Sequence, residues 1–585
     1  MKRLFLIAAL IAVGCGDNNN GNGNHDMSMN GGGGDGGGDN VDMTPPSDLA
    51  DTTATPAPTS MHVGATGPSG GLVTAGVTAA AYLLNPTGSP ATGELHVTTA
   101  TGGDKVVDTG VGIGSYQLTH DGKQVIYSKA SGNNGSLFWA DVSGATATKK
   151  TLFTGTFASA TLSSGGFMSP SGHFFLAGVR PPNVAQSLDM HVIRMTDGAD
   201  VFDRINGGFD YLEVVLPDDT CIFQDTAGGT SNTVPGVQTL YWTALPMTGT
   251  TTTATAINTR TANMTPVNAS TLVYLKTNGD LYTWDTAAKT GAGTKVASNV
   301  VKYTVGSDTT GPLAFIAADG SVHVQSLDGA TKLLDTPASQ ATSFRAPLVL
   351  APDNGDLYFF QNGDLVGGGV QNNAGTLMRV AVQSGATPSK IADMVSIVDL
   401  NVFDNAVVFL QNLTAPPAPP GIQFGDAAKA NRDGSGISML GMKVPVGGLQ
   451  AVNPGPDTWF AMHLTMAVDD SATNSTIDGS PLAYGALSWE DYTSGTPVAL
   501  DAKVHQGAFG FALDDGRTAA FVTGATFNAT AGNYVGSLAF IAARAPSMKV
   551  DGMLTGVSEL GPIINRSLFV NAPTATMAGV YFVKY

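Results

Sequence analysis

The chain has 585 residues and a formal net charge of −18 at neutral pH, with 28 Lys and Arg against 46 Asp and Glu. So acidic a balance argues against nucleic-acid binding, which needs a basic surface, and against electrostatic attachment to anionic lipid. Hydrophobic residues make up 42% of the chain, which is enough for a large buried core.

Residues 1–14 have the layout of a secretory signal peptide. The positively charged residues Lys2 and Arg3 are followed by an apolar stretch from Leu4 to Val13. This stretch is too short to span a bilayer as a mature helix. The sequence Ala-Val-Gly-Cys at 12–15 resembles the bacterial lipobox, with Ala at the position where Leu is usual. The resemblance implies cleavage before Cys15 and attachment of diacylglycerol to its thiol. The alternative is an ordinary signal peptide followed by an incidental cysteine.

We expect the mature protein to be secreted through the inner membrane and held at a membrane by covalent lipid. Several acyl chains anchor firmly, because each buried methylene contributes about 0.8 kcal/mol. Gly16 follows Cys15, where the resemblance implies that Asp would favour the inner membrane. The outer membrane is therefore favoured, on its periplasmic face or at the cell surface. With Cys15 lipidated, the other cysteine, Cys221, has no disulfide partner and is expected to be a small buried hydrophobe.

Residues 15–60 are predicted to form a disordered tether behind the lipid. Gly, Asn and Asp dominate, and neither Lys, Arg nor an aromatic residue occurs between 16 and 60. Such a composition cannot offset the entropy of ordering. His25, Met27 and Met29 are soft enough to be copper ligands. We favour a plain solvated tether.

From residue 61 onward the sequence predicts strands and turns. Thr, Val, Gly and Asp prevail, and the whole chain has four glutamates. A motif recurs, namely an apolar residue, a tight polar turn and a bulky apolar strand, as in LTHDGKQVIYSK (118–129) and LAPDNGDLYFFQ (350–361). The turn residues of its clear and weaker copies are Asp121, Ser171, Asp218, Asn268, Asp308, Asp353, Asp404, Asp457, Asp514 and Asn565.

This repeat predicts an all-β fold, a β-propeller of about ten repeat units of 40–57 residues. The motif resembles the Pro-Asp-Gly repeats of TolB-like and WD40-like bacterial propellers. One ring usually holds four to eight blades, so two tandem propellers are favoured over one wide ring. A first set of repeats would occupy 61–300 and a second set 301–585. The last residues, AGVYFVKY, are expected to form a closing strand that pairs with N-terminal sequence.

The sequence offers no convincing catalytic constellation. Neither a Gly-x-Ser-x-Gly nucleophile elbow nor a His-Glu-x-x-His metal motif occurs. The stretch 430–440 partly resembles an EF-hand loop, but Lys429 and Leu440 would occupy two ligand positions. We therefore predict no catalytic residue, no metal site and no cofactor.

Two long polar stretches, 411–436 and 468–481, interrupt the repeat. Loops on a rigid scaffold often carry recognition, although tolerated surface insertions look the same. The candidate recognition residues are Gln423, Asp426, Asn431, Arg432, Asp433, Asp469, Asp470 and Asp478.

The expected function is that of a membrane-anchored, non-enzymatic envelope or cell-surface lipoprotein. Its propeller would bind or scaffold another envelope protein, a peptide or a glycan, an expectation based on what propellers commonly do. Two alternatives stay open. One is a propeller enzyme, a lyase or glycoside hydrolase, with Asp or His residues at the central channel. The other is a structural surface-layer component.

Overall fold

The computed structural model describes most of the chain beyond residue 58. The described residues are 59–88, 91–131, 134–158, 162, 166–180, 189–204, 214–216, 218–225, 239–251, 253–259, 261–268, 271–306, 311–342, 344, 346–362, 374–414, 422–455, 458–469, 483–491, 497–511, 518–528, 533–542 and 554–584. The predicted signal peptide, Cys15 and the tether up to residue 58 lie outside them. The first strand begins at Thr59, so the last two residues of the predicted tether are strand rather than disordered chain.

The described residues form nine antiparallel sheets and no α-helix. Six of these sheets consist of four strands that are consecutive in the chain. They are β2 (Ser69–Ala75), β3 (Ala79–Thr87), β4 (Thr92–Thr99) and β5 (Lys105–Gly112); β14 (Val214–Val215), β15 (Thr220–Asp225), β16 (Thr239–Ala244) and β17 (Thr255–Thr259); β18 (Thr261–Asn268), β19 (Thr271–Lys276), β20 (Leu281–Asp285) and β21 (Thr294–Ala297); β22 (Val300–Val305), β23 (Leu313–Ala317), β24 (Val322–Gln325) and β25 (Lys332–Asp335); β26 (Val349–Leu350), β27 (Asp356–Gln361), β28 (Ala374–Ala381) and β29 (Ser389–Ser396); and β30 (Leu400–Val402), β31 (Ala406–Gln411), β32 (Phe424–Asn431) and β33 (Ser438–Pro445).

Two larger sheets each divide into two four-stranded halves. The first contains β6 (Tyr116–Leu118), β7 (Gln124–Ser131), β8 (Asn134–Asp141), β9 (Thr148–Phe157), β10 (Gly166–Met168), β11 (Phe174–Val179), β12 (Asp189–Arg194) and β13 (Ala199–Arg204). Its halves are joined by the pair Phe157 and Val179. The second contains β34 (Leu449–Gly455), β35 (Thr458–Asp469), β36 (Ala483–Asp491), β37 (Val498–Phe511), β38 (Thr518–Asn528), β39 (Asn533–Ala542) and β40 (Thr555–Val557). The long strand β37 pairs with β36 through its first part and with β38 mainly through its last residues.

The remaining sheet joins the two ends of the described chain. Its order is β1 (Thr59–His62), β43 (Gly579–Lys584), β42 (Ser567–Ala572) and β41 (Glu559–Leu560). Counted in this way, the described strands form eleven four-stranded units. We number them 1 to 11 in chain order, from the unit of β2–β5 to the unit that combines β41–β43 with β1.

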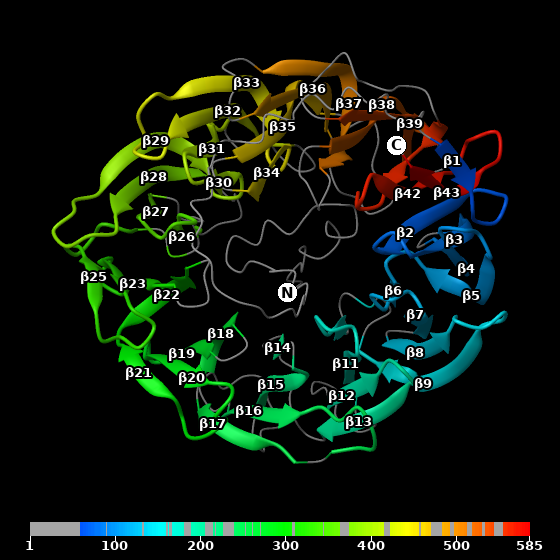
Figure 1. Cartoon of the computed structure of the whole chain (residues 1–585), viewed down its shortest axis with the longest axis horizontal. Coiled ribbons are helices and arrows are strands. Elements are labelled where there is room, and N and C mark those ends of the chain that lie inside the picture. The colour runs from blue at the N-terminus through cyan, green and yellow to red at the C-terminus, as the bar shows by residue number, and fades with distance from the viewer. Residues whose placement is uncertain are drawn as a thin grey trace, which may run out of the picture.

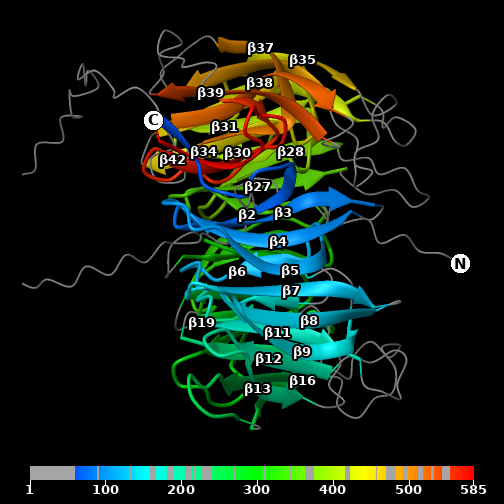
Figure 2. The same ribbon diagram turned by 90° about the vertical axis from the view of Figure 1, so that its right-hand side faces the viewer.

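The units follow one another around one ring, and the first strands labelled there, β2, β6, β14, β18, β22, β26, β30 and β34, lie nearest the middle (Figure 1). Seen edge-on, units 1, 2 and 3 succeed one another along the side of the molecule (Figure 2). Eleven hydrophobic clusters of described residues lie between neighbouring units. Because neighbours cover both faces of a unit, second strands such as β11 and β23 are buried along their whole length. Cys221, in β15, is fully buried in one of these clusters, as predicted.

The first and last units are in contact. Strand β1 pairs with β43 in a register that sets His62 opposite Tyr581, which confirms the predicted closing strand. Tyr82 of unit 1 and Phe569 of unit 11 lie in one cluster.

The units form one ring, whereas the number of predicted repeats favoured two tandem propellers (Figure 1). The physical reason is that a neighbouring unit covers each face of every unit. No sheet face is left bare at which a first ring could end and a second one begin. The predicted division at 300/301 falls inside β22, after its first residue, and the units of β21 and β22 share a hydrophobic cluster.

The repeat marks correspond to the turn between the first and second strands of a unit. Asp308, Asp457 and Asp514 lie outside the described residues, and Asn268 ends β18. The marks in this turn are Asp121, Ser171, Asp218, Asp353, Asp404 and Asn565. The unit that the motif missed is unit 1, whose turn, 76–78, has neither Asp nor Asn. In the described part of the chain, no helix has the length and apolarity needed to cross a membrane.

Candidate functional site

The recurring aspartates stabilise one side of the ring. Strands alternate in direction within a unit, so the turn between its first two strands lies at the same edge as the turn between its last two. We call the side that carries these turns the turn face. Here Asp218 Oδ1 accepts a hydrogen bond from the Thr220 amide at 3.0 Å, and Asp353 Oδ1 accepts one from the Gly355 amide at 2.8 Å. Such bonds close tight turns, which explains why Asp recurs there.

The turns also bind their neighbours. Lys289, in the last turn of unit 5, donates from Nζ to Thr220 Oγ1 at 2.7 Å and lies 3.4 Å from Asp218 Oδ2 in unit 4. Nδ1 of His173, in unit 3, lies 2.8 Å from Oδ2 of Asp219, in unit 4. These contacts clamp successive units together on the turn face.

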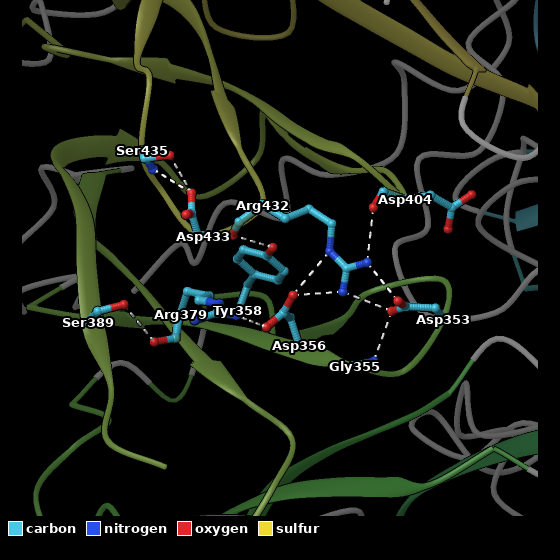
Figure 3. A network of polar contacts seen from close by, with 10 residues as sticks. All are labelled: Asp353, Gly355, Asp356, Tyr358, Arg379, Ser389, Asp404, Arg432, Asp433 and Ser435. Carbon is cyan, nitrogen blue, oxygen red and sulfur yellow. Dashed lines mark hydrogen bonds and ion pairs between the residues drawn. The ribbon is translucent and has the colours of Figure 1, made fainter.

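The most extensive clamp is built around Arg432, one of the predicted recognition residues (Figure 3). Its Nη1 donates to Asp353 Oδ2 at 2.7 Å and to the Asp404 carbonyl at 2.9 Å. Nη2 donates to Asp353 Oδ1 at 2.8 Å and to Asp356 Oδ2 at 2.6 Å, and Nε donates to the same Asp356 oxygen at 3.0 Å. All five guanidinium N–H groups therefore have acceptors. Arg432 fastens unit 8 to unit 7.

Electrostatics and a second arginine complete this clamp. The hydrogen bonds from Arg432 lower the pKa of Asp353 more than burial raises it. The Asp356 side chain is 7% exposed and also forms an ion pair with Arg379. The Tyr358 hydroxyl donates a hydrogen bond to the Arg432 carbonyl at 2.9 Å. With its donors engaged inside the protein, Arg432 has a structural role in the described clamp.

The other candidates in 411–436 do not gather into one site. Gln423 is buried and donates from Nε2 to the Thr414 carbonyl at 2.7 Å. Asp426 accepts hydrogen bonds from Asn412 Nδ2 at 3.1 Å and the Lys443 amide at 3.2 Å. Both residues hold the sheet of unit 8 together.

Asn431 ends β32, and Asp433 lies in the turn between β32 and β33. There Asn431 Nδ2 donates to Ser435 Oγ at 3.0 Å, and Asp433 Oδ1 accepts from the Ser435 amide at 2.8 Å. Asp469 ends β35, and Asp470 and Asp478 lie outside the described residues.

The interpretation of 411–436 as one long loop is wrong for residues 424–431, which form strand β32. Small residues at its buried positions, such as Gly425, Ala428 and Ala430, give this strand little hydrophobicity. Because the strand has so few large apolar residues, its sequence resembled that of a polar insertion.

A groove on the turn face is a candidate binding site. It has a volume of about 560 Å³ and lies where the last turns of units 5 and 6 meet. Its lining residues are Thr271, Thr283, Trp284, Asp285, the hairpin residues 290–294, Leu327 and Asp328.

The hairpin wall of this groove is held from below. Trp284 Nε1 donates to the Gly291 carbonyl at 3.2 Å, and Tyr274 Oη donates to the Ala292 carbonyl. Gly293 has a φ of +77°, and a Cβ there would lie 2.3 Å from the Thr283 carbonyl oxygen, so this position requires glycine. These contacts make the wall a fixed surface.

The groove presents hydroxyl and carboxylate groups. Asp285 Oδ1 accepts from the amides of Ala287 and Ala288, and Asp328 Oδ1 accepts from Ser326 Oγ and the Ala330 amide. The second oxygen of each carboxylate has no hydrogen-bond partner among the described residues. The hydrogen bond from Ser326 lowers the pKa of Asp328, which is therefore ionised at neutral pH.

With four threonines beside the two carboxylates, the groove suits a ligand rich in hydroxyl groups and disfavours anions. Sequence reasoning missed it, and its one local signal is Gly-Ala-Gly at 291–293. In the described part of the chain, no group of three or more His, Cys, Asp or Glu side chains is placed to hold a metal ion.

No family model matches the chain, and no curated protein matches it. Solved structures do. A crystal structure of the eukaryotic initiation factor is 9% identical at a TM-score of 0.36, covering 64% of this chain and 89% of that chain. A crystal structure of the tricorn protease is 10% identical at a TM-score of 0.21, covering 86% of this chain and 46% of that chain. At such TM-scores these similarities carry no conclusion about function, and the β-propeller-like fold rests on the sheets themselves.

Proposed function

We propose that the chain is a secreted, non-enzymatic binding protein of the cell envelope, anchored by lipid on Cys15. The signal layout and the lipobox-like sequence at 12–15 support the anchor. We further propose that the eleven units form one closed propeller, in which β1 completes the last blade. The pairing of β1 with β43 supports closure. Such a ring provides a rigid surface on which a partner can be held.

The groove between units 5 and 6 is the observation that carries the binding function. Its carboxylates accept hydrogen bonds from hydroxyl groups, and its threonines both donate and accept them. Leu327 adds apolar surface, and the lining contains neither Lys nor Arg for an acidic ligand. Among the candidate partners, an envelope protein, a peptide or a glycan, these groups favour an uncharged glycan.

Titration of neutral oligosaccharides into the full-length protein, purified in detergent, tests this function. Asp328→Asn and Asp285→Asn should each weaken binding by about tenfold, because each removes a charged hydrogen-bond acceptor. Asp319→Asn is the matched control, since Asp319 also caps a turn in unit 6 but does not line the groove. If neutral glycans do not bind, or if all three variants bind them equally, the groove is not a glycan site.

The anchor is tested separately by metabolic labelling with a palmitate analogue. The wild-type chain should incorporate label and sediment with membranes, whereas Cys15→Ser should do neither. An unlabelled wild-type chain would remove the lipoprotein proposal while leaving the groove proposal intact.

A further inference from the structure

A second cavity lies on the inner side of the ring and shares no lining residue with the groove. Its volume is about 160 Å³. It is lined by Thr265 of β18, by residues 302–305 of β22, and by Pro347 and Leu348, which precede β26. Strands β18, β22 and β26 are first strands of their units and lie nearest the middle of the ring (Figure 1). The cavity is therefore an inner-wall pocket.

Lys302 places a positive charge in this pocket. Its Nζ donates to the Ala346 carbonyl, a neutral acceptor. Burial lowers the pKa of this lysine, so its ammonium is partly deprived of water. Among the described first strands of the units, Lys302 is the one Lys or Arg residue. For unit 10, the first strand is taken as the last three residues of β37. Among the described first strands, the pocket therefore carries the one cationic side chain, which attracts an anion.

The surroundings of Lys302 limit what fits. Tyr303 points to the opposite side of β22, where its hydroxyl lies 3.0 Å from Thr265 Oγ1 and donates to the Val273 carbonyl at 3.2 Å. Thr304 lies on the same side of the strand as Lys302. A space of about 160 Å³ holds roughly five water molecules, so only a small terminal group enters. One ammonium and one hydroxyl match a carboxylate better than a phosphate, which usually binds several cationic or amide donors.

The inner edge of β22 offers the second element of recognition. In the described sheet, β22 is a terminal strand that pairs with β23 alone. Terminal strands expose backbone N–H and C=O groups on which an extended peptide can add as a further strand. Pocket and strand edge lie together at residues 302–305.

We propose that the inner-wall pocket binds the carboxylate of an extended peptide. Lys302 pairs with the carboxylate, Thr304 Oγ1 donates a hydrogen bond to it, and the peptide backbone adds along the inner edge of β22. This site is separate from the groove and does not depend on glycan binding there.

Competitive acetylation of the full-length protein tests the proposal without a variant. The protein is trace-labelled with acetic anhydride at pH 8, and the label on each lysine is measured by mass spectrometry. A carboxylate that raises the pKa of Lys302 by about one unit lowers its reactive amine fraction about tenfold. Saturating acetyl-Ala-Ala-Ala with a free carboxylate should therefore slow the labelling of Lys302, whereas the same peptide as its amide should not. Lys332, which is 76% exposed, is the internal control.

Direct binding of a fluorescent form of the carboxylate peptide gives the second readout. Lys302→Met should weaken binding at least about tenfold, and Lys332→Met should leave it unchanged. Equal labelling of Lys302 with the acid and the amide, or equal binding by Lys302→Met and the wild type, would overturn the proposal. Protection by free acetate as strong as that by the peptide would overturn the peptide as ligand.

Discussion

Arg432 is the residue whose loss should affect the fold most directly. Truncation leaves Asp356, which is 7% exposed, with Arg379 as its remaining charged partner in the clamp. We expect Arg432→Ala to lower the free energy of unfolding by about 3 kcal/mol, the scale for breaking a buried ion pair. Urea unfolding followed by circular dichroism measures this.

Lys123→Ala is the control for this prediction. Its ion pair with Asp121 spans 3.1 Å, but the two side chains are 60% and 49% exposed. Solvent screens such a pair, so its loss should change stability little. Equal effects of the two variants would mean that the Arg432 network does not stabilise the protein.

His96 should stabilise the protein at low rather than high pH. Its Nδ1 lies 2.7 Å from Asp104 Oδ2 and its Nε2 lies 2.7 Å from Glu94 Oε1. Burial lowers its pKa, but these two carboxylates outweigh burial and raise the pKa above 6.5. The contribution is therefore fully present below pH 6.5 and is lost as pH rises through the raised pKa. His96→Gln should cost about 1–3 kcal/mol at pH 6 and less at pH 9 in urea unfolding. A pH-independent cost contradicts an imidazolium at this position.

His463 should have the opposite dependence. It is fully buried, and burial lowers its pKa to about 4, against the hydrogen bond to the Leu440 carbonyl. Because the unfolded chain takes up this proton at pH 6.5, the folded state loses stability as pH falls from 6.5 towards 4, by up to about 3 kcal/mol. His463→Phe should flatten the loss in stability between pH 6.5 and 4. An unchanged slope would assign that loss to other groups.

Among the elements, β1 is the strand by which the N-terminal end of the described chain adds to the sheet of the last unit. It pairs with β43 alone, through Ser60 opposite Val583 and Met61 opposite Phe582. Neighbouring residues of such a strand direct their N–H groups to opposite sides. Of the variants Ser60→Pro and Met61→Pro, one therefore removes an N–H that bonds to β43, and the other removes an N–H that points to the open edge. We expect one variant to lose about 3 kcal/mol in thermal or urea unfolding and the other to lose much less. Two neutral variants would show that the β1 pairing does not stabilise the protein.

The elements also show how far the sequence predicts this fold. An aspartate that closes its own turn is a local feature, so Asp121, Asp218 and Asp353 correctly marked the first turn of their units. Unit 1 was missed because a Gly turn replaces the Asp turn. The partners of Arg432 were not predictable, because Asp353 and Asp356 are 79 and 76 residues away in the chain. The groove likewise depends on two turns from different units.

At the scale of the whole molecule, the number of rings was beyond the sequence. The repeat period sets the size of a unit, whereas the angle between neighbours depends on the side-chain volumes packed at every interface. A small change in that angle, repeated at each interface, decides whether the chain returns to its start after half of the units or after all of them. The sequence therefore predicted the units well and their arrangement poorly.

Producing residues 59–300 and 301–585 as separate chains distinguishes one ring from two. In one ring, each half exposes two apolar faces, one of them carrying Val273 and Leu281 in the first half or Val305 and Phe315 in the second, all from the shared cluster. Exposed patches of that size drive association or aggregation. We therefore expect each half to aggregate alone, and the two to be recovered together as a one-to-one complex by size exclusion when co-produced. Two separately soluble, folded halves would instead show that the boundary at 300 divides two independent propellers, because only a ring that closes within each half buries all of its sheet faces.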